Sequence, residues 1–231
     1  MMRRVLCAWL CGLLGYASAE PLVLVSPLPL DEPHVARLKQ VLDQAFAPLP
    51  DSYRLQYLPP KRALEALAGG QVVGDISRIA LYGSLVPDAI RVQPYLSTAW
   101  LYLVARRGDS LPRQLAHVGS ERLAYTHGIL ILQQRTEGML RREASPSDES
   151  CLKKVEAGRV RYCLSFNYRP QMEATLAPYA QTLVWRRVEA QPVYLWLAPG
   201  QQALADSLGW QLQHLLRSGR LTQLMGRFRE P

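Results

Sequence analysis

Arg78 is the residue of this chain whose chemistry best suits the capture of a small charged molecule. It closes the stretch Val72–Arg78 (VVGDISR), and we expect it in a turn after a short strand that ends at Asp75. A guanidinium can donate to both oxygens of a carboxylate or phosphate at once. The alternative is an ion pair between Arg78 and Asp75, in which Asp75 organises the turn.

A second candidate is the run Thr126, His127 and Gly128, which we expect to form a turn between a strand and a helix. Backbone N–H groups at the start of a helix can hold an anion. His127 could add a donor, or it could be a solvated loop histidine. It is also the only attractive general acid or base. No nucleophile and base are spaced for hydrolysis.

The cysteines predict a disulfide rather than a metal site. Cys151 and Cys163 are the only cysteines after residue 19, and in an oxidising compartment such a pair is expected to bond. The alternative is two buried free thiols. Their spacing is not that of a zinc site, and the histidines are isolated, so we expect no metal and no cofactor.

The N-terminus has the pattern of a secretory signal peptide. Arg3 and Arg4 precede the apolar run Val5–Tyr16, and Ala17–Ala19 offers small residues for cleavage before Glu20. The apolar run is shorter than the roughly 20 residues that a membrane-spanning helix needs. We therefore expect an exported protein in the periplasm, cleaved after Ala19.

Composition narrows the possible partners. About 210 residues remain after cleavage, enough for one large domain or two small ones. The net charge of +8 comes from basic residues scattered among acidic ones. Since no basic stripe alternates with aromatics, nucleic-acid binding is disfavoured. The charge indicates either a solvated surface or a cleft that favours anions.

The elements that must position these residues fall into two similar units. Hydrophobic periodicity predicts a strand at 21–26, a helix at 31–49 with Asp31 as its N-cap, a strand at 53–58 and a helix at 61–67. A long strand at 91–105 follows. The second unit then has a strand at 122–125, a helix to about 142, a polar loop at 144–150, a helix at 151–157 and a strand at 160–164. Strands at 182–188 and 193–197 and helices at 201–216 and 221–228 complete the chain.

Strands that alternate with helices predict parallel sheets covered by helices. Four tryptophans are expected in the core: Trp100, Trp185, Trp196 and Trp210.

Four segments, in this order, resemble the type 2 periplasmic solute-binding proteins, specifically the extracellular solute-binding protein family 3. They are Arg62–Ile79, Ser120–Gly128, Val155–Val160 and Leu215–Phe228. The resemblance extends over nearly the whole mature chain. It implies an α/β fold of two Rossmann-like lobes joined by two crossing strands, with a ligand cleft and a hinge between the lobes.

The resemblance also implies where the lobes divide. The crossings would fall near Tyr95–Thr98 and Gln191–Tyr194. The first lobe would comprise residues 20–97 and 193–231, and the second would comprise residues 98–192.

Ligands of such sheets bind beyond the carboxyl ends of the strands. The candidate ligand-binding residues are therefore Arg78, Ser26, Tyr57, Tyr95, Ser97, Thr126, His127, Gly128, Asn167 and Tyr194. Tyr57 could instead belong to the core, and Tyr95, Ser97 and Tyr194 could simply line the hinge.

The chain departs from the family's amino-acid binders in two places. Those proteins carry Thr-x-x-Arg shortly before Pro-Tyr, whereas Arg78 lies farther from Pro94 and the Thr is absent. They also place an acidic residue after the strand of the second lobe, where this chain has Phe166-Asn167. An anion without an ammonium group is therefore favoured as the ligand.

The sequence thus predicts a monomeric periplasmic binding protein for a small polar or anionic solute. It would deliver that solute to an ABC permease or to a sensor. The alternatives are a dehydratase-like enzyme of the same fold and a structural or assembly factor that binds nothing.

Overall fold

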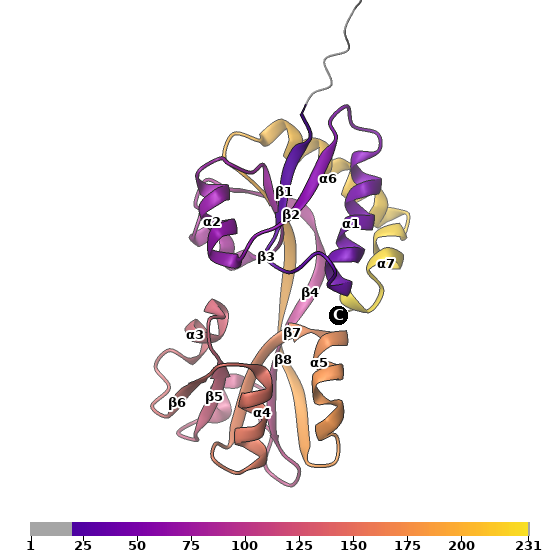
Figure 1. Ribbon diagram of the computed structural model, residues 1–231. Coiled ribbons are helices and arrows are strands. Elements are labelled where there is room, and N and C mark those ends of the chain that lie inside the picture. The colour runs from indigo at the N-terminus through magenta and orange to yellow at the C-terminus, as the bar shows by residue number, and fades with distance from the viewer. Residues whose placement is uncertain (1–19, 231) are drawn as a thin grey trace, which may run out of the picture.

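Two long antiparallel strands, β4 (Ile90–Arg106) and β8 (Leu183–Leu197), run the length of the molecule and connect two α/β lobes (Figure 1). The computed structural model describes residues 20–230, so the expected signal peptide lies outside the described residues. The predicted class, two α/β lobes joined by two crossing strands, is confirmed. The division at residues 97 and 192 remains our proposal.

The upper lobe in Figure 1 holds strands β1 (Leu22–Ser26), β2 (Tyr53–Tyr57) and β3 (Gly74–Ile79), helices α1 (Pro33–Phe46), α2 (Pro60–Ala68), α6 (Gln202–Arg217) and α7 (Arg220–Met225), and the 3-10 turn η1 (Ala80–Ser84). The lower lobe holds strands β5 (Leu123–Thr126), β6 (Arg142–Ser145) and β7 (Tyr162–Tyr168) and helices α3 (Leu130–Thr136), α4 (Asp148–Glu156) and α5 (Arg169–Leu176). No helix within residues 20–230 is long and apolar enough to cross a membrane.

The strand order is β2-β1-β3-β8-β4-β7-β5-β6, and the strand directions decide where the functional edges lie. β1, β2 and β3 are mutually parallel, and β3 runs antiparallel to β8. β5, β6 and β7 are also parallel, and β7 runs antiparallel to β4. Because β4 and β8 are antiparallel, the strands of the upper lobe point towards the lower lobe, and those of the lower lobe point back. The carboxyl ends of both strand sets therefore face each other across the region between the two lobes, which is called the waist below.

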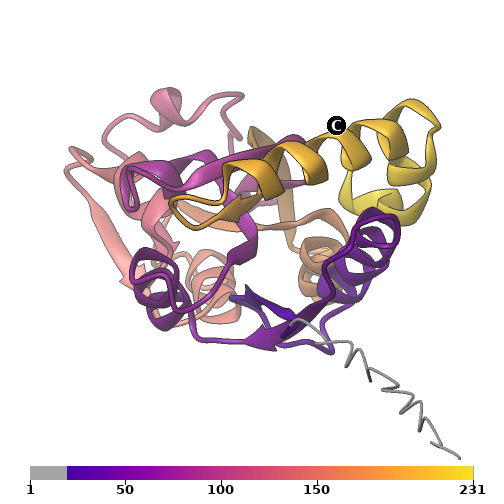
Figure 2. The same cartoon turned by 90° about the horizontal axis from the view of Figure 1, so that it is seen from above.

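Each lobe buries both faces of its part of the sheet. In the upper lobe, α1, α6 and α7 pack on one face around Leu38, Leu42 and Leu208, and α2 packs on the other around Leu67. Figure 2, a view along the long axis, shows α1 beside the C-terminal helices and α2 across the strands. In the lower lobe, α4 and α5 cover one face and α3 the other.

The prediction for the tryptophans is only partly right. Trp196 is 4% exposed and Trp100 is partly buried, whereas Trp185 is 38% and Trp210 is 61% exposed. Trp210 lies on α6, and Trp185 lies on the part of β8 that has no neighbouring strand on one side.

Two predictions in the first half of the chain need correction. The first helix starts at Pro33 rather than Asp31, and Glu32, not Asp31, occupies the N-cap position. The fixed φ of proline suits the first turn of a helix, which explains the later start. Arg78 lies inside β3, not in a turn after it, because β3 continues past an irregularity between Asp75 and Arg78 and pairs with β8 as far as Ile79.

The stretch predicted as a helix to residue 142 and a loop at 144–150 was wrong. α3 ends at Thr136, and Gly138, with a φ of +84°, turns the chain back. Residues 142–145 then form β6 beside β5. α4 starts at Asp148, three residues before the predicted helix, because the Ser147 side chain caps it.

Two strands are longer than expected. β7 continues to Tyr168, so Asn167 lies within the strand and not after it. β8 runs unbroken through Gln191-Pro192, where it pairs with Ala99 and Thr98 of β4. Helix α5, which starts next to Pro170, was not predicted.

Candidate functional site

The carboxyl edge of the upper lobe carries Ser26, Tyr57 and Arg78. Ser26 is fully buried, and its hydroxyl donates to the carbonyl of Leu28 (2.7 Å) and accepts from the N–H of the same residue (3.1 Å). It therefore shapes the turn after β1. Tyr57, at the end of β2, is 45% exposed, so it is not part of the core.

Arg78 is held in place by three neighbours. Its Nε donates to Asp75 Oδ2 (2.7 Å) and its Nη2 donates to the carbonyl of Pro60 (3.1 Å). Its guanidinium carbon lies 4.9 Å from the ring centre of Tyr82. The ion pair that was weighed against ligand capture is thus present, but two bonds use only two of the five N–H groups of a guanidinium. The side chain remains 17% exposed.

Asp75 orients Arg78 through their ion pair. Its side chain is fully buried and also accepts from the N–H of Ser77 (3.4 Å) and from the hydroxyl of Tyr82 (3.4 Å). Burial raises the pKa of Asp75, and the positive charge of Arg78 opposes that rise. A carboxylate this deep needs its partner. The pair therefore fixes the direction of the guanidinium.

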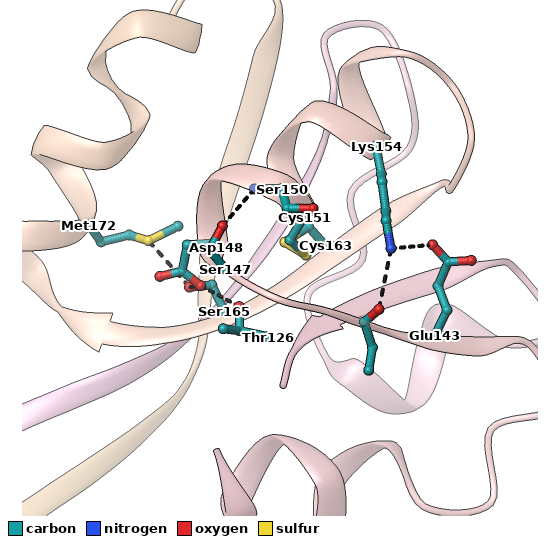
Figure 3. The surroundings of a disulfide bond; sticks show 11 residues. Thr126, Glu143, Ser147, Asp148, Ser150, Cys151, Lys154, Cys163, Ser165 and Met172 are labelled. Atoms are coloured by element: carbon teal, nitrogen blue, oxygen red, sulfur yellow. Dashed lines mark hydrogen bonds and ion pairs between the residues drawn. A yellow bond between two sulfur atoms is a disulfide. The ribbon is translucent and has the colours of Figure 1, made fainter. Parts of the chain in front are cut away.

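The carboxyl edge of the lower lobe holds a second cluster, around Asp148 (Figure 3). Asp148 Oδ1 accepts from the hydroxyls of Thr126, at the end of β5, and of Ser165 in β7 (2.7 Å). Ser147 caps the same helix by accepting from the N–H of Ser150 (3.1 Å). A carboxylate in the first turn of a helix is stabilised by the helix dipole.

Sequence reasoning placed Thr126 correctly at a strand end but missed Asp148 entirely. The available signal was the Ser147-Asp148 pair at the start of a helix, which is typical of an N-terminus. Directly behind the cluster, a disulfide joins Cys151 of α4 to Cys163 of β7, with a Cα–Cα distance of 5.7 Å (Figure 3). The disulfide anchors the helix that carries Asp148.

His127 and Gly128 form the turn that follows β5. The backbone N–H of His127 donates to the carbonyl of Ser145 (2.8 Å), and its side chain is exposed. Gly128 has a φ of +82°, a conformation that glycine adopts without strain. The imidazole is therefore accessible from solvent at the edge of the lower lobe.

Three other candidates serve their own neighbours. Asn167 Oδ1 accepts from the N–H of Tyr168 (2.9 Å). The ring of Tyr95 lies under the guanidinium of Arg229 (3.9 Å), and the ring of Tyr194 lies under that of Arg91 (4.9 Å). Tyr95 and Tyr194 thus lie on the crossing strands in stacked pairs.

The remaining candidate, Ser97, belongs to a buried cluster that joins the lobes. Its hydroxyl lies 2.8 Å from His34 Nε2, and both side chains are fully buried. The His34 ring stacks on Tyr168 of the lower lobe at a centroid distance of 3.7 Å. The hydroxyl of Tyr168 in turn shares a hydrogen bond with Ser77 of β3 (2.9 Å).

This cluster, made of His34, Ser97, Tyr168 and Ser77, is called the latch below. Burial lowers the pKa of His34 to about 3, and its Nδ1 has no hydrogen-bond partner among the described residues. His34 is therefore neutral at neutral pH. Tyr168 completes the apolar core of the upper lobe together with Phe228.

Ion pairs reinforce the latch at the surface. Arg169, the first residue of α5, pairs with Glu230 and with Glu173 (2.8 Å). Glu173 also pairs with Arg227 of the C-terminal segment. Four charged side chains thus connect α5 of the lower lobe to residues 227–230.

Within residues 20–230, no three His, Cys, Asp or Glu side chains lie together as they would around a metal ion. The charged groups at the facing edges are instead Arg78 above and Asp148 below. Arg78 can bind an anionic group of a ligand. The Oδ2 of Asp148 has no hydrogen bond to a described residue, so it can accept from an N–H or O–H group of a ligand.

Comparison with known proteins reveals the fold but no near relative. No protein-family model and no curated protein matches the chain. Among solved structures, the GluR0 ligand-binding core in complex with L-glutamate is 14% identical, with a TM-score of 0.71 over 92% of this chain and 100% of that one. A histidine kinase sensor domain with similarity to periplasmic binding proteins is 16% identical, with a TM-score of 0.68 over 93% and 99%.

A third structure is the arginine-, lysine- and histidine-binding protein ArtJ of Geobacillus stearothermophilus. It is 12% identical, with a TM-score of 0.65 over 92% of this chain and 97% of that one. All three match almost the full described chain as well as nearly their own full length. The chain therefore has the fold of the type 2 periplasmic binding proteins.

Proposed function

We propose that this protein is an exported solute-binding protein that holds a small polar solute between its lobes and passes it to an ABC permease or reports it to a sensor. The observation that carries the proposal is the meeting of two strand edges, with Arg78 on one and Asp148 on the other. Ligands of open α/β sheets bind at such carboxyl edges.

The ligand class follows from these two charges. Arg78 suits a carboxylate or another anion. Asp148, with the hydroxyls of Thr126 and Ser165, suits an ammonium or hydroxyl group. The sequence argument against amino acids rested on a missing acidic residue. Since Asp148 supplies a carboxylate at the lower edge, amino acids join organic acids as candidate ligands.

Export is supported by the signal-like residues 1–19 and by the Cys151–Cys163 disulfide, because disulfides persist in oxidising compartments. Two of the similar structures point to the two destinations. One is a histidine kinase sensor domain, and another is the substrate-binding protein of an amino-acid ABC transporter.

A thermal-shift screen of residues 20–231 against organic acids, amino acids and polyamines tests the proposal. A ligand at 100 times its Kd should stabilise the protein by about 2.7 kcal/mol. For a chain of this size, that raises Tm by roughly 5–10 °C. The absence of a shift with every class would contradict a solute-binding role.

Three variants then assign the edges. Arg78→Ala should abolish binding, and Asp75→Asn/Arg78→Ala, which removes the buried charge as well, separates lost binding from lost folding. Asp148→Asn should weaken an amino-acid ligand at least tenfold and leave an organic acid unaffected. Arg54→Gln, an exposed arginine on β2, is the matched control.

A further inference from the structure

A pocket on the outer face of the lower lobe is separate from the facing strand edges. It has a volume of about 240 Å³ and lies between α5 and the strands β4 and β8. Its lining residues are Tyr102, Arg169, Glu173, Trp185, Arg186 and Arg187. We call it the Tyr102 pocket.

The sheet topology explains why the pocket is open. β3 pairs with β8 only from Val193 to Leu197, so in the lower lobe β8 is an outer strand. Trp185 on this outer part is 38% exposed, and the neighbouring Arg186 and Arg187 are exposed as well. Met172 and Leu176 of α5 belong to the same buried core cluster as Tyr102. The indole of Trp185 and the guanidinium groups of Arg186 and Arg187 therefore lie next to the buried phenol of Tyr102.

The hydroxyl of that phenol is the unusual group. Tyr102 is only 2% exposed, and its Oη has no hydrogen-bond partner among the described residues. Buried polar groups are nearly always paired, so an unpaired one calls for an explanation. Tyr102 lines the pocket together with Arg187, Glu173 and Arg169, whose charges act on this hydroxyl.

The Tyr102 hydroxyl can donate a hydrogen bond but has no acceptor among the described residues. Burial raises the pKa of Tyr102 to about 12, so the phenol keeps its proton at neutral pH. The described residues that line the pocket include three arginines and one carboxylate, Glu173, which already accepts from Arg169 and Arg227. An acceptor for the Tyr102 proton is thus supplied most readily by an anion from outside.

The other residues of the pocket indicate which groups the ligand carries besides the anion. The guanidinium carbon of Arg187 lies 4.5 Å from the ring centre of Trp100, so this part of the pocket is both aromatic and positively charged. The exposed indole of Trp185 offers a flat apolar surface. Pockets for drug-sized molecules measure about 300–1,000 Å³, so this one admits only a small ligand.

We propose that the Tyr102 pocket is a second binding site, which takes a small aromatic carboxylate. The carboxylate accepts from the Tyr102 hydroxyl and from an arginine on β8, and the ring of the ligand lies against Trp185. This site is independent of the function proposed for the facing edges.

Titration with benzoate, followed by NMR chemical shifts, tests the proposal. Benzoate should bind saturably. Benzamide, which lacks the negative charge, and acetate, which lacks the ring, should each bind at least tenfold more weakly. Equal affinities for the three compounds, or no saturable binding of benzoate, would overturn the assignment.

Variants locate the binding. Tyr102→Phe removes one hydroxyl and should weaken benzoate at least tenfold without lowering Tm, because that hydroxyl has no partner to lose. Trp185→Ala should also weaken it, whereas Trp210→Ala, an exposed tryptophan on α6, should not. Arg54→Gln, which removes an exposed arginine of β2 far from the pocket's lining residues, should leave benzoate binding unchanged. Unaltered affinity in Tyr102→Phe, or lost affinity in Arg54→Gln, would place the ligand elsewhere.

Discussion

The two sides of the waist differ in how firmly they join the lobes. On the α5 side, Tyr168 of the lower lobe enters the core of the upper lobe, and Arg169 and Glu173 pair with the C-terminal segment. On the other side, no hydrogen bond or ion pair within residues 20–230 connects α2 with α3, and Ile79 and Leu81 make the apolar contact. Figure 1 shows these helices at the opposite flank from α5.

The difference indicates how the lobes can move. A side fastened by a stacked, hydrogen-bonded and ion-paired contact acts as a pivot, and a side with apolar contact alone can open and close. Closure on a ligand would then swing α3 towards α2 about the α5 side, as in hinge motions of two-domain binding proteins. Four experiments test whether the α5 side is the stronger one.

The largest effect is expected from Tyr168→Ala. It removes the stacking on His34, the edge-on contact with Phe228 and the bond to Ser77, and truncating a buried aromatic residue costs about 3–5 kcal/mol. Urea unfolding measures the loss, and X-ray scattering should show a larger radius of gyration. Tyr168→Phe keeps the ring and should cost only about 1 kcal/mol. Equal losses in the two variants would show that stacking does not hold the lobes.

A comparable loss without a change of shape is expected from Cys151→Ala/Cys163→Ala. The disulfide closes a loop of 12 residues inside the lower lobe, and its removal should cost about 3 kcal/mol. Because it lies away from the latch, scattering should be unaltered. An expanded molecule after reduction would mean that the lower lobe, not the latch, sets the lobe arrangement.

The third effect depends on pH. The pKa of His34 is about 3 in the folded protein, against 6.5 for an ordinary histidine. Above pH 6.5 neither state is protonated, and the latch is at full strength. Between pH 6.5 and 3 the unfolded state binds a proton that the folded state does not. The free energy of unfolding should therefore fall by up to about 1.4 kcal/mol per pH unit as the pH drops.

Denaturation at pH 7.5, 5.5 and 4.5 measures this slope. His34→Phe keeps a stacked ring without a titrating group, so the difference between the two slopes isolates His34. Parallel slopes in the two proteins would remove His34 as the source of acid sensitivity.

The smallest effect is expected from the ion pairs. The side chains of Arg227 and Glu173 are 52% and 37% exposed, and exposed pairs contribute about 0–1 kcal/mol. Arg227→Gln should therefore change the free energy of unfolding by less than 1 kcal/mol. Leu130→Ala, at the start of α3, is the control from the other side of the waist and should stay within about 0.5 kcal/mol. If Arg227→Gln lowered the free energy of unfolding by more than 2 kcal/mol, the ion pairs rather than Tyr168 would be the main contact between the lobes.

Elements with local signals could be predicted from the sequence. Helix α2 stops before Gly69-Gly70 and α4 before Gly158, as expected from their glycines. β6 could not be predicted, because its first three residues are exposed and it is a strand only through its pairing with β5. Its neighbourhood therefore looked like a loop.

The site was harder to predict for the same reason. Asp148 meets Thr126 and Ser165 across 22 and 17 residues of sequence, and His34 meets Ser97 across 63. No spacing pattern encodes such contacts. Strand ends, in contrast, could be predicted, which is why Ser26, Tyr57 and Thr126 lie where the pattern indicated.

Strand β6 also affects whether copies of the protein can aggregate through their sheet edges. It is the last strand of the sheet, and an open strand edge is a template on which another chain can add and aggregate. This edge is four residues long and carries Arg142 and Glu143, and Lys154 both pairs with Glu143 (2.8 Å) and donates to the carbonyl of Ala144 (3.3 Å). An incoming strand would meet charge and an occupied acceptor, so the edge is protected against self-assembly into fibres.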